Sequence, residues 1–455
     1  MDAALEKRIK RQVIGKPHRF LAVSPLGFEQ TLVKELEFIR RETSDENQPH
    51  VTGDGKVEFT AKITEAWKAV AYSRIASRVL MEVANFKAEN FREFEKKASE
   101  IPWELYLPNL SLNIHVTCKH SRLYHSDAIA ERLQKIIDKG GSLPLAPSRQ
   151  NLYVNFLDDR CTIWLDLAGE ELYKRGHERF VNEAPLKETI AAAMLFEAIN
   201  LMDPIGASRL QDDSNPTTNI VTPDSVPGPP YTLLDLMSGS GTFSLEAAYI
   251  ANKLIPGVCR DFALKHHPAF KEATWNFITR SVTLSETKGP VKSCKAFATI
   301  EKIITSDISE RAVNIIKHNV ESSPLASINP PPINPQLKDF FSYTAKEIAD
   351  ACGDSSSIML LNPPYGKRLD FDAPRLYTKI GQKLTELANS LATFNKRLTV
   401  AVLAPKDDTR NGAKYTCTTN LLRECPALSP EHNPSAKIIE TSHGGLSLNA
   451  IIATL

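Results

Sequence analysis

The sequence predicts an α/β protein: an open, mainly parallel sheet in the C-terminal half and smaller α+β units before it. Short apolar runs at 233–235, 299–308 and 358–361 predict buried strands. Segments with apolar residues at helical spacing follow the first two runs, as in successive strand–helix units. A polar residue ends each run, where open α/β sheets bind their ligands.

A glycine turn follows the first of these strands. The strand ends at Asp235, and the turn Ser238–Thr242 leads into a helix. Glycines let the backbone adopt positive φ and pass close to a ligand, while Asp235 can accept from an ammonium or hydroxyl group. A dinucleotide fingerprint needs a third glycine where this chain has Ser244, and a Walker lysine is absent. NAD and ATP sites are therefore disfavoured.

Two more acidic residues follow later strands. Asp307 ends the second apolar run, the place where an acid typically holds ribose hydroxyls. Asp339 precedes the third run and is positioned to face an adenine amino group. Singly, each acid is an ordinary loop carboxylate. Their order with the glycine turn and Asn362 predicts a nucleoside-binding site.

The tetrapeptide Asn362-Pro363-Pro364-Tyr365 closes the third run. Both prolines fix φ and lack an N–H, so the turn is stiff and presents its carbonyls as acceptors. The Asn362 amide oxygen and the Pro363 carbonyl can together hold an exocyclic amino group, and Tyr365 can stack on the planar ring that carries it. The motif predicts a site that alkylates a planar amine.

These motifs resemble those of class I S-adenosylmethionine (SAM) methyltransferases with an Asn-Pro-Pro-Tyr motif. From about Phe20 to the C-terminus, the chain is similar to the THUMP-containing 23S rRNA guanine-N2 methyltransferases of the RlmL/YpsC type. One departure is Asp235-Leu236-Met237-Ser238, where the family commonly has Asp-Pro-Met-Cys. Further segments that carry the resemblance are Leu172–Gly176, Glu183–Thr189, Ile255–Gly257 with Arg260, Gly366–Leu369, and Leu376–Tyr377 with Gly381.

The resemblance implies a seven-stranded Rossmann-like methyltransferase sheet with SAM as cofactor. It implies an N-terminal arm and ferredoxin-like part over 1–62, a THUMP RNA-binding domain over 63–168, and the methyltransferase domain over 169–455. Pro/Ser-rich stretches near 203–230 and 321–337 are expected to be flexible insertions. Residues 185–202 are expected to form an amphipathic helix. The expected cofactor-binding residues are Asp235, Ser238, Gly239, Gly241, Thr242, Asp307, Asp339 and Asn362; the catalytic residues are Asn362, Pro363, Pro364 and Tyr365.

Candidate RNA contacts lie before the methyltransferase sheet. Lys119, Arg122, Tyr124 and His125 form a basic and aromatic cluster after a predicted strand, suited to phosphate contact and base stacking. Lys174 and Arg175, with Arg179, are placed to reach the substrate backbone. On residue type alone, all of these are equally well solvated surface residues. The resemblance favours RNA contact for the cluster of Lys119, Arg122, Tyr124 and His125, and leaves both interpretations open for Lys174, Arg175 and Arg179. No metal site is expected, because no ligand pair stands at suitable spacing.

Several functions share the tetrapeptide. Enzymes that methylate adenine N6 in DNA, or glutamine in release factors, also use it. The N-terminal half resembles an RNA-holding unit and argues against both. A THUMP-type tRNA guanine-N2 methyltransferase and a non-catalytic RNA-binding assembly factor remain alternatives to an enzyme that acts on 23S rRNA.

Composition sets further limits. The net charge of +1 gives no overall nucleic-acid signature, so RNA affinity must come from local basic patches. No apolar run approaches the ~18 residues of a membrane span, and the N-terminus has no apolar core typical of a signal peptide. Seven scattered cysteines without a C-x-x-C pair favour a reducing compartment. The expected location is cytoplasmic.

Overall fold

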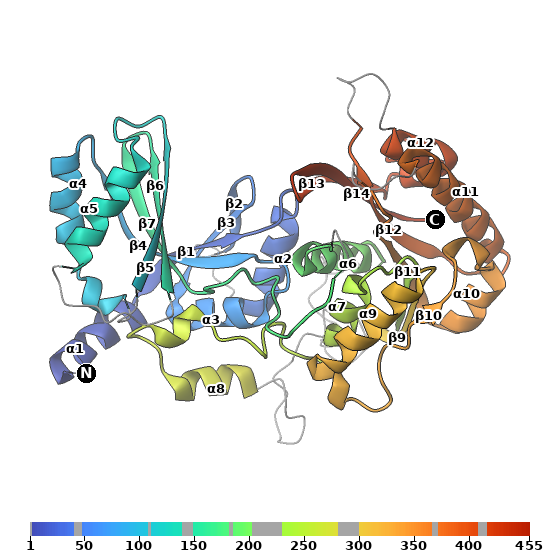
Figure 1. Cartoon of the computed structure of the whole chain (residues 1–455), viewed down its shortest axis with the longest axis horizontal. Helices are drawn as coiled ribbons and strands as arrows, with labels where there is room; N and C mark the ends of the chain where they lie inside the picture. The colour runs from blue at the N-terminus through green and yellow to red at the C-terminus, as the bar shows by residue number, and fades with distance from the viewer. Residues whose placement is uncertain are drawn as a thin grey trace, which may run out of the picture. The chain divides into compact units, whose positions relative to one another are not determined.

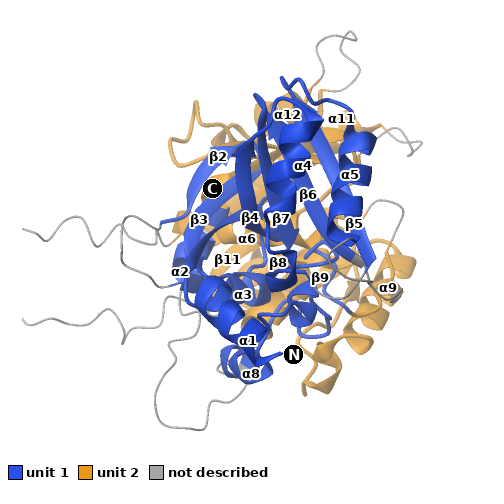
Figure 2. Ribbon diagram, turned by 90° about the vertical axis from the view of Figure 1, so that its left-hand side faces the viewer, with its two compact units in different colours: residues 1–24, 32–176, 255–285 blue, residues 25–31, 177–254, 286–455 orange. Residues whose placement is uncertain are grey.

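The computed structural model describes residues 2–40, 48–107, 111–138, 149–181, 185–202, 230–280, 300–365, 372–407 and 416–455. The chain divides into two compact units, shown in different colours in Figure 2. Unit 1 comprises 1–24, 32–176 and 255–285, and unit 2 comprises 25–31, 177–254 and 286–455. The expected insertion at 203–229, Glu183 and Ala184, and the motif Gly366–Leu369 lie outside the described residues.

Unit 1 is built on one seven-stranded sheet. In spatial order its strands are β2 (His50–Gly53), β3 (Lys56–Lys62), β1 (Pro17–Val23), β4 (Arg78–Lys87), β7 (Arg160–Asp166), β6 (Arg149–Leu157) and β5 (Ser111–Lys119). All pairs are antiparallel except β5 with β6. The alternation of apolar residues in the sequence predicts strands at 18–23, 112–116, 151–156 and 160–167, and the structure has a strand at each.

Helices cover one face of this sheet. In Figure 2, α4 (Phe91–Ser99) and α5 (Ser126–Asp138) lie over the strands β4, β7, β6 and β5. Apolar side chains such as Ile129 and Leu133 alternate with polar ones along α5, so one stripe is buried against the sheet. The other helices of this unit are α1 (Ala3–Ile9), η1 (Lys10–Ile14), α3 (Ile63–Tyr72), most of α2 (Glu29–Arg40), η3 (Trp103–Leu105), η5 (Ala263–His266) and α8 (Glu272–Arg280).

The segment 255–280 belongs to unit 1, although we expected one methyltransferase domain over 169–455. Arg260 explains this difference. Its guanidinium is buried and donates to the carbonyls of Glu170, Glu171 and Lys174 at 2.7–2.8 Å. Burial lowers the pKa of Arg260 to about 10. Sequence order alone does not show such a return of the chain.

Unit 2 also contains a seven-stranded sheet. In spatial order its strands are β10 (Gln336–Leu337), β9 (Ile300–Asp307), β8 (Tyr231–Asp235), β11 (Ser356–Leu361), β12 (Leu398–Pro405), β14 (Leu446–Thr454) and β13 (Lys437–His443). The first five strands are parallel, while β14 is antiparallel to both β12 and β13. The Rossmann-like sheet with a reversed terminal hairpin is therefore confirmed.

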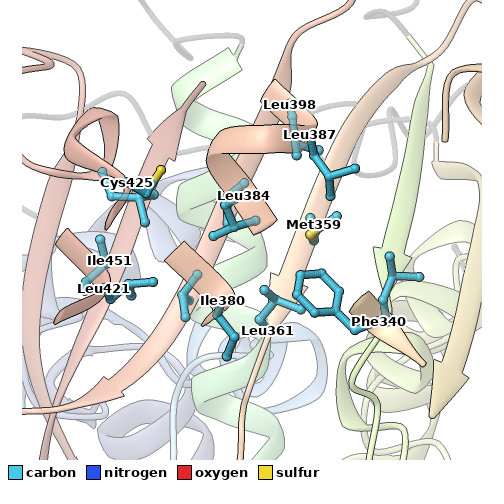
Figure 3. Packing of buried hydrophobic residues seen from close by; sticks show 14 of the residues in the cluster. Phe340, Met359, Leu361, Ile380, Leu384, Leu387, Leu398, Leu421, Cys425 and Ile451 are labelled. Atoms are coloured by element: carbon cyan, nitrogen blue, oxygen red, sulfur yellow. The ribbon is translucent and has the colours of Figure 1, made fainter. Parts of the chain in front are cut away.

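The central strands β8, β11 and β12 are buried along almost their whole length because helices cover both faces. Figure 3 shows part of one core, in which Phe340, Met359 and Leu361 pack with Ile380 and Leu384. Helices of this unit are α6 (Glu188–Met202), α7 (Thr242–Ala251), α9 (Glu310–Glu321), η6 (Pro324–Ser327), η7 (Phe340–Ser342), α10 (Ala345–Cys352), α11 (Ala373–Ala392), α12 (Cys417–Glu424) and η9 (Pro426–Leu428) (Figure 1).

Two expectations about unit 2 are wrong. Helix α6 is not amphipathic: it is buried from Thr189 through Asn200, because it packs against α7 and three strands. The stretch 321–337 is not a flexible insertion. It forms the end of α9, then η6 and β10, and its Leu325 and Ile333 are buried in a core with Leu245 and Ile316. The two apolar side chains anchor a proline-rich segment that composition alone describes as a linker.

Candidate active site

The glycine turn lies at the carboxyl end of β8, as expected. Gly239 and Gly241 have φ of +54° and +78°. A Cβ at Gly239 would meet no atom within 4 Å, so space above the turn is open. A Cβ at Gly241 would stand 2.9 Å from the side chain of Ile316. The first glycine leaves room for a ligand, and the second lets α7 pack closely on α9.

Asp235 lies beneath this turn and is fully buried. One carboxylate oxygen, Oδ2, accepts from the Ser244 hydroxyl at 2.6 Å and from its N–H at 3.1 Å. The other, Oδ1, has no hydrogen-bond partner among the described residues. Burial raises the pKa of Asp235 to about 7. Its carboxyl group therefore both orients the start of α7 and offers one free acceptor.

Asp307 holds the turn from the neighbouring strand. Because β8 and β9 are parallel and in register, the ends of both strands meet at one edge. The Gly239 N–H donates to Asp307 Oδ2 at 2.8 Å, and the Ser309 N–H donates to Oδ1 at 2.9 Å. Ser238 donates from its N–H and its hydroxyl to the Ser306 carbonyl. Asp307 thus fixes the glycine turn and keeps further lone pairs on each oxygen.

Asp339 lies beyond the next strand at the same edge. Leu337 pairs with Asp307 in the parallel ladder β10–β9, and Asp339 follows two residues later. Its carboxylate caps η7 by accepting from the Phe341 N–H at 3.1 Å. The capping contact accounts for one oxygen only.

The Asn-Pro-Pro-Tyr turn follows β11, which pairs with β8 in parallel. Pro363 is buried and Pro364 is exposed. The Asn362 Oδ1 atom is buried, yet within the described part of the chain it accepts no hydrogen bond. Tyr365 is half-buried, and burial raises its pKa to about 12, so the phenol is protonated at neutral pH. The turn Asn362–Tyr365, called the proline corner below, therefore places the unsatisfied Asn362 Oδ1 acceptor near the half-buried Tyr365 ring.

Sheet topology brings the predicted site residues to one edge. The strands β10, β9, β8 and β11 are consecutive in the sheet, and Asp339, Asp307, the glycine turn and Asn362 follow their carboxyl ends. Parallel pairing makes this convergence unavoidable, because all four strands point the same way.

The sequence reasoning missed Asn319 as a positioning residue. This fully buried side chain accepts from the Phe180 N–H at 2.8 Å, and donates to the carbonyls of Phe180 at 2.9 Å and Ser240 at 3.1 Å. It ties the segment 177–181 to the glycine turn. Nothing in the helical pattern of α9 distinguishes this residue from a surface asparagine.

Arg179 belongs to the same segment. Its guanidinium pairs with Glu188 and donates to the hydroxyl of Thr242 at the start of α7. The side chain is only 10% exposed, so it supports the donor turn and is not a free surface charge. Thr242 is thereby held by the hydrogen bond to its side chain as well as by its place at the start of α7.

Arg175 corrects an expected RNA contact. It is 5% exposed and donates to the carbonyls of Leu172 and Arg74 inside unit 1, so it has no surface from which to reach RNA. Lys174 is exposed and pairs with Glu170. The resemblance placed both at a junction, but alternate residues of an irregular segment point to opposite sides.

The other candidate RNA contacts lie together on the surface of unit 1. Lys119 ends β5 and is exposed. Arg122 pairs with Glu89, and its backbone N–H donates to Asp159 at 2.7 Å. Tyr124 is 66% exposed, and its ring lies 4.1 Å from that of His125. These four side chains are accessible, and their role in RNA binding stays a prediction.

Two further searches cover only the described residues. None of the helices in those ranges is long and apolar enough to cross a membrane. Within the same ranges, no group of three or more His, Cys, Asp or Glu side chains is arranged to hold a metal ion.

The sheet order, the glycine turn and the proline corner define the α/β class of methyltransferase domains. The RMKL-like methyltransferase domain matches residues 227–414, and the RlmL ferredoxin-like domain matches residues 19–80. By similarity, these two matches assign residues 19–80 to a ferredoxin-like domain and residues 227–414 to a methyltransferase domain.

Curated relatives agree with this assignment. The ribosomal RNA large subunit methyltransferase K/L of Allochromatium vinosum is 28% identical over 81% of this chain and 46% of the relative. The protein of the same name from Shewanella sp. strain MR-7 is 28% identical over 80% of this chain and 46% of the relative. The chain thus spans about half the length of the curated relatives it matches.

Solved structures share the fold. SMU.472, described as a methyltransferase and complexed with SAH, is 21% identical with a TM-score of 0.68, over 96% of this chain and 98% of the other. A predicted N6-adenine-specific DNA methylase from Listeria monocytogenes strain 4b F2365 is 21% identical with a TM-score of 0.67, over 99% and 98%. At this identity they show the fold alone.

Proposed function

We propose that this protein transfers a methyl group from SAM to the exocyclic N2 amine of a guanosine in large-subunit ribosomal RNA. The observation that carries the proposal is the buried Oδ1 of Asn362 at the carboxyl edge of the sheet, which has no hydrogen-bond partner among the residues that the structure describes. An unsatisfied buried acceptor costs about 1–3 kcal/mol. A chain keeps such an atom where a ligand supplies the donor, and an exocyclic amine is such a donor.

The residues at this edge fit SAM. Space over Gly239 admits a ligand close to the backbone, and the free Oδ1 of Asp235 is a second buried acceptor next to the turn. We assign cofactor binding to the turn with Asp235, Asp307, Asp339 and Asn362. SAM supplies an electrophilic methyl group, so no covalent intermediate on the enzyme is required.

The tasks of the chain are to orient the amine and exclude water. The guanine N2 lone pair is delocalised into the ring, and acceptance of its N–H groups by Asn362 Oδ1 and the Pro363 carbonyl localises it. Orientation of this kind contributes roughly 7–11 kcal/mol in favourable cases. Tyr365 stacks on the base after its extrusion from the RNA, a contact of about 1–3 kcal/mol. The proton lost after transfer passes to water.

Support for an RNA substrate comes from the names of the curated relatives and from the ferredoxin-like match at 19–80. The domain boundaries expected above remain part of the proposal, including the THUMP domain at 63–168. So does the cytoplasmic location, where ribosomal RNA is made and modified in bacteria.

Transfer of tritiated methyl from SAM to total RNA tests the proposal. We expect incorporation into large-subunit rRNA, and digestion of the labelled RNA to yield N2-methylguanosine. The Asn362→Ala variant serves as the inactive control. Label in tRNA would favour the THUMP-type tRNA alternative, and label in adenosine would overturn the guanine assignment. Bound SAM and bound RNA without incorporation would favour a non-catalytic assembly factor.

A further inference from the structure

The open sheet face is the surface of β5, β6 and β7 opposite α4 and α5; it carries His115, Tyr153 and Thr162. We propose that this face binds single-stranded RNA, with a base stacked beside His115. The inference rests on the proposed function, because it names the surface that holds the substrate. It adds a stacking site to the loop cluster around Tyr124.

The register of three strands aligns aromatic side chains in one row. His115 pairs with Tyr153 across β5–β6, and Tyr153 pairs with Trp164 across β6–β7. The rings of His115 and Tyr153 are stacked, 4.8 Å apart at 15°. Trp164 is buried at 3% exposure, Tyr153 is half-buried, and His115 is exposed. The exposure of the rings therefore increases along the row, from the buried Trp164 on β7 to the exposed His115 on β5.

The open ring lies at the edge of the sheet. β5 is the last strand of the order, so no strand of the described ranges covers that side of His115. On the inner side, the guanidinium of Arg78 lies 5.6 Å from the Tyr153 ring. Arg78 therefore packs on the inner end of the stack at Tyr153, and a further ring can be added only beyond His115. A nucleobase extends such a stack whatever its identity, because every base has a π face.

Polar side chains flank this row on the same face. The Asn113 amide donates to Asn151 at 3.1 Å, and Asn85 donates to the hydroxyl of Thr162 at 2.9 Å. Thr117 is exposed on β5, two residues beyond His115. Amides and hydroxyls offer both donors and acceptors, as needed for the edges of unpaired bases.

Charge at one end of the face complements a phosphate backbone. Lys119 and Arg160 are exposed at the ends of β5 and β7. Arg160 donates to the neutral amide oxygen of Asn85 at 2.7 Å, and it forms no ion pair with an acid in the described part of the chain. Lys87 is paired with Glu89 at 2.7 Å, so it contributes less. Cations beside a row of rings suit single strands, since bases in a duplex are already stacked.

The test measures binding of a fluorescently labelled, unstructured RNA oligonucleotide to the full chain by anisotropy. The double variant His115→Ala/Tyr153→Leu should bind about tenfold more weakly or worse, because base–aromatic stacking is lost. Phe277→Ala is the matched control: this aromatic side chain is 73% exposed on α8 of the same unit. It should bind as the parent does.

Two variants of opposite charge at Thr117 test the open sheet face without removing a packed ring. Thr117→Glu should weaken binding, and Thr117→Lys should strengthen it and steepen the dependence of affinity on salt. Lys96→Gln on α4, which covers the opposite face, should change nothing. Equal effects of the two Thr117 variants, or unchanged affinity in all face variants, would overturn the inference.

Methyl transfer separates this inference from the proposed function. If RNA is methylated but the face variants bind and react as the parent does, the open sheet face fails and the function stands. If no RNA is methylated but the face variants still lose oligonucleotide binding, the face stands and the function fails. Circular dichroism spectra identical to the parent's show that a loss is not due to unfolding.

Discussion

At the scale of single residues, two of the buried polar atoms that lack a partner among the described residues coincide with motifs of the predicted site. Asn362 and Asp235 each keep one buried oxygen without a partner in the described part of the chain. Such atoms are costly in a folded protein, and natural structures contain few of them. Both belong to the edge that the sequence predicts as a ligand site. This agreement between energetic cost and motif position is why we assign the two residues different tasks.

Replacement of Asn362 by Ala should separate catalysis from cofactor binding. Loss of the amide removes an acceptor for the substrate amine, so turnover should fall at least tenfold. The glycine turn and Asp307 remain, so SAM affinity measured by calorimetry should change little. An equal loss of SAM affinity would contradict this division of roles.

Replacement of Asp235 by Asn should change how stability depends on pH. The pKa of the buried Asp235 carboxyl is raised from 3.8 to about 7, so the folded state favours its neutral form. That contribution is fully present below about pH 4 and is lost as pH rises to about 7. The variant has no such ionisation and should gain stability relative to the parent over this range, by an amount on the order of a few kcal/mol.

Urea unfolding at pH 5 and pH 8 measures the difference. Circular dichroism is the suitable signal, because all four tryptophans lie in unit 1 and Asp235 lies in unit 2. A stability difference between variant and parent that is the same at both pH values would show that the Asp235 carboxyl does not titrate in this window.

At the scale of elements, the donor turn is held from three directions. Asp307 on β9 accepts from Gly239, Asn319 on α9 donates to Ser240, and Arg179 contacts the first residue of α7. The turn is short and glycine-rich, and its conformation depends on these neighbours. A backbone fixed in this way needs no further ordering when a ligand binds.

Gly241→Ala should disrupt this arrangement, and Gly445→Ala is its matched control. Both glycines have φ near +80°, so both variants carry the same conformational cost of about 1 kcal/mol. Only at Gly241 would the new methyl group meet a side chain, Ile316 at 2.9 Å; at Gly445 there is nothing within 4 Å. Gly241→Ala should therefore lose more stability and also SAM affinity.

Thermal unfolding and SAM calorimetry check this pair. Ile316→Ala removes the two γ-carbons that the new methyl group would meet, so Gly241→Ala should cost less stability in an Ile316→Ala background than in the parent. Equal destabilisation by the two glycine variants would show that close packing of α7 on α9 is unimportant here.

At the scale of the whole molecule, the two compact units carry different kinds of functional groups. Unit 2 carries the buried acceptors and the glycine turn, while unit 1 carries the exposed rings and cations. The net charge of +1 does not reveal this division, since 55 basic and 54 acidic side chains nearly balance over the whole chain. We therefore expect unit 1 to bind RNA and unit 2 to bind the cofactor.

Hydrogen exchange should show that response. S-adenosylhomocysteine should slow exchange in the backbone around Ser238–Thr242 and Asp307, and an unstructured RNA oligonucleotide should slow it in β5 and β6. Protection of unit 1 strands alone by S-adenosylhomocysteine would contradict the placement of the donor site. The comparison needs no active enzyme, because it reads binding only.

Local patterns in the sequence sufficed for most strands of both sheets, for the glycine turn and for the order of polar residues after the strands, but not for β2, β4 and β10. Those features depend on spacing along the chain, which the sequence records directly. Only the tertiary structure decided that α6 is buried on all sides, that 321–337 packs into a core, and that Arg175 lies inside unit 1. Only the tertiary structure also revealed the hydrogen bonds of Asn319 to Phe180 and Ser240, and the stacking of His115 on Tyr153. Each depends on which distant segments meet, and burial by a distant segment leaves no periodic signal in the buried one.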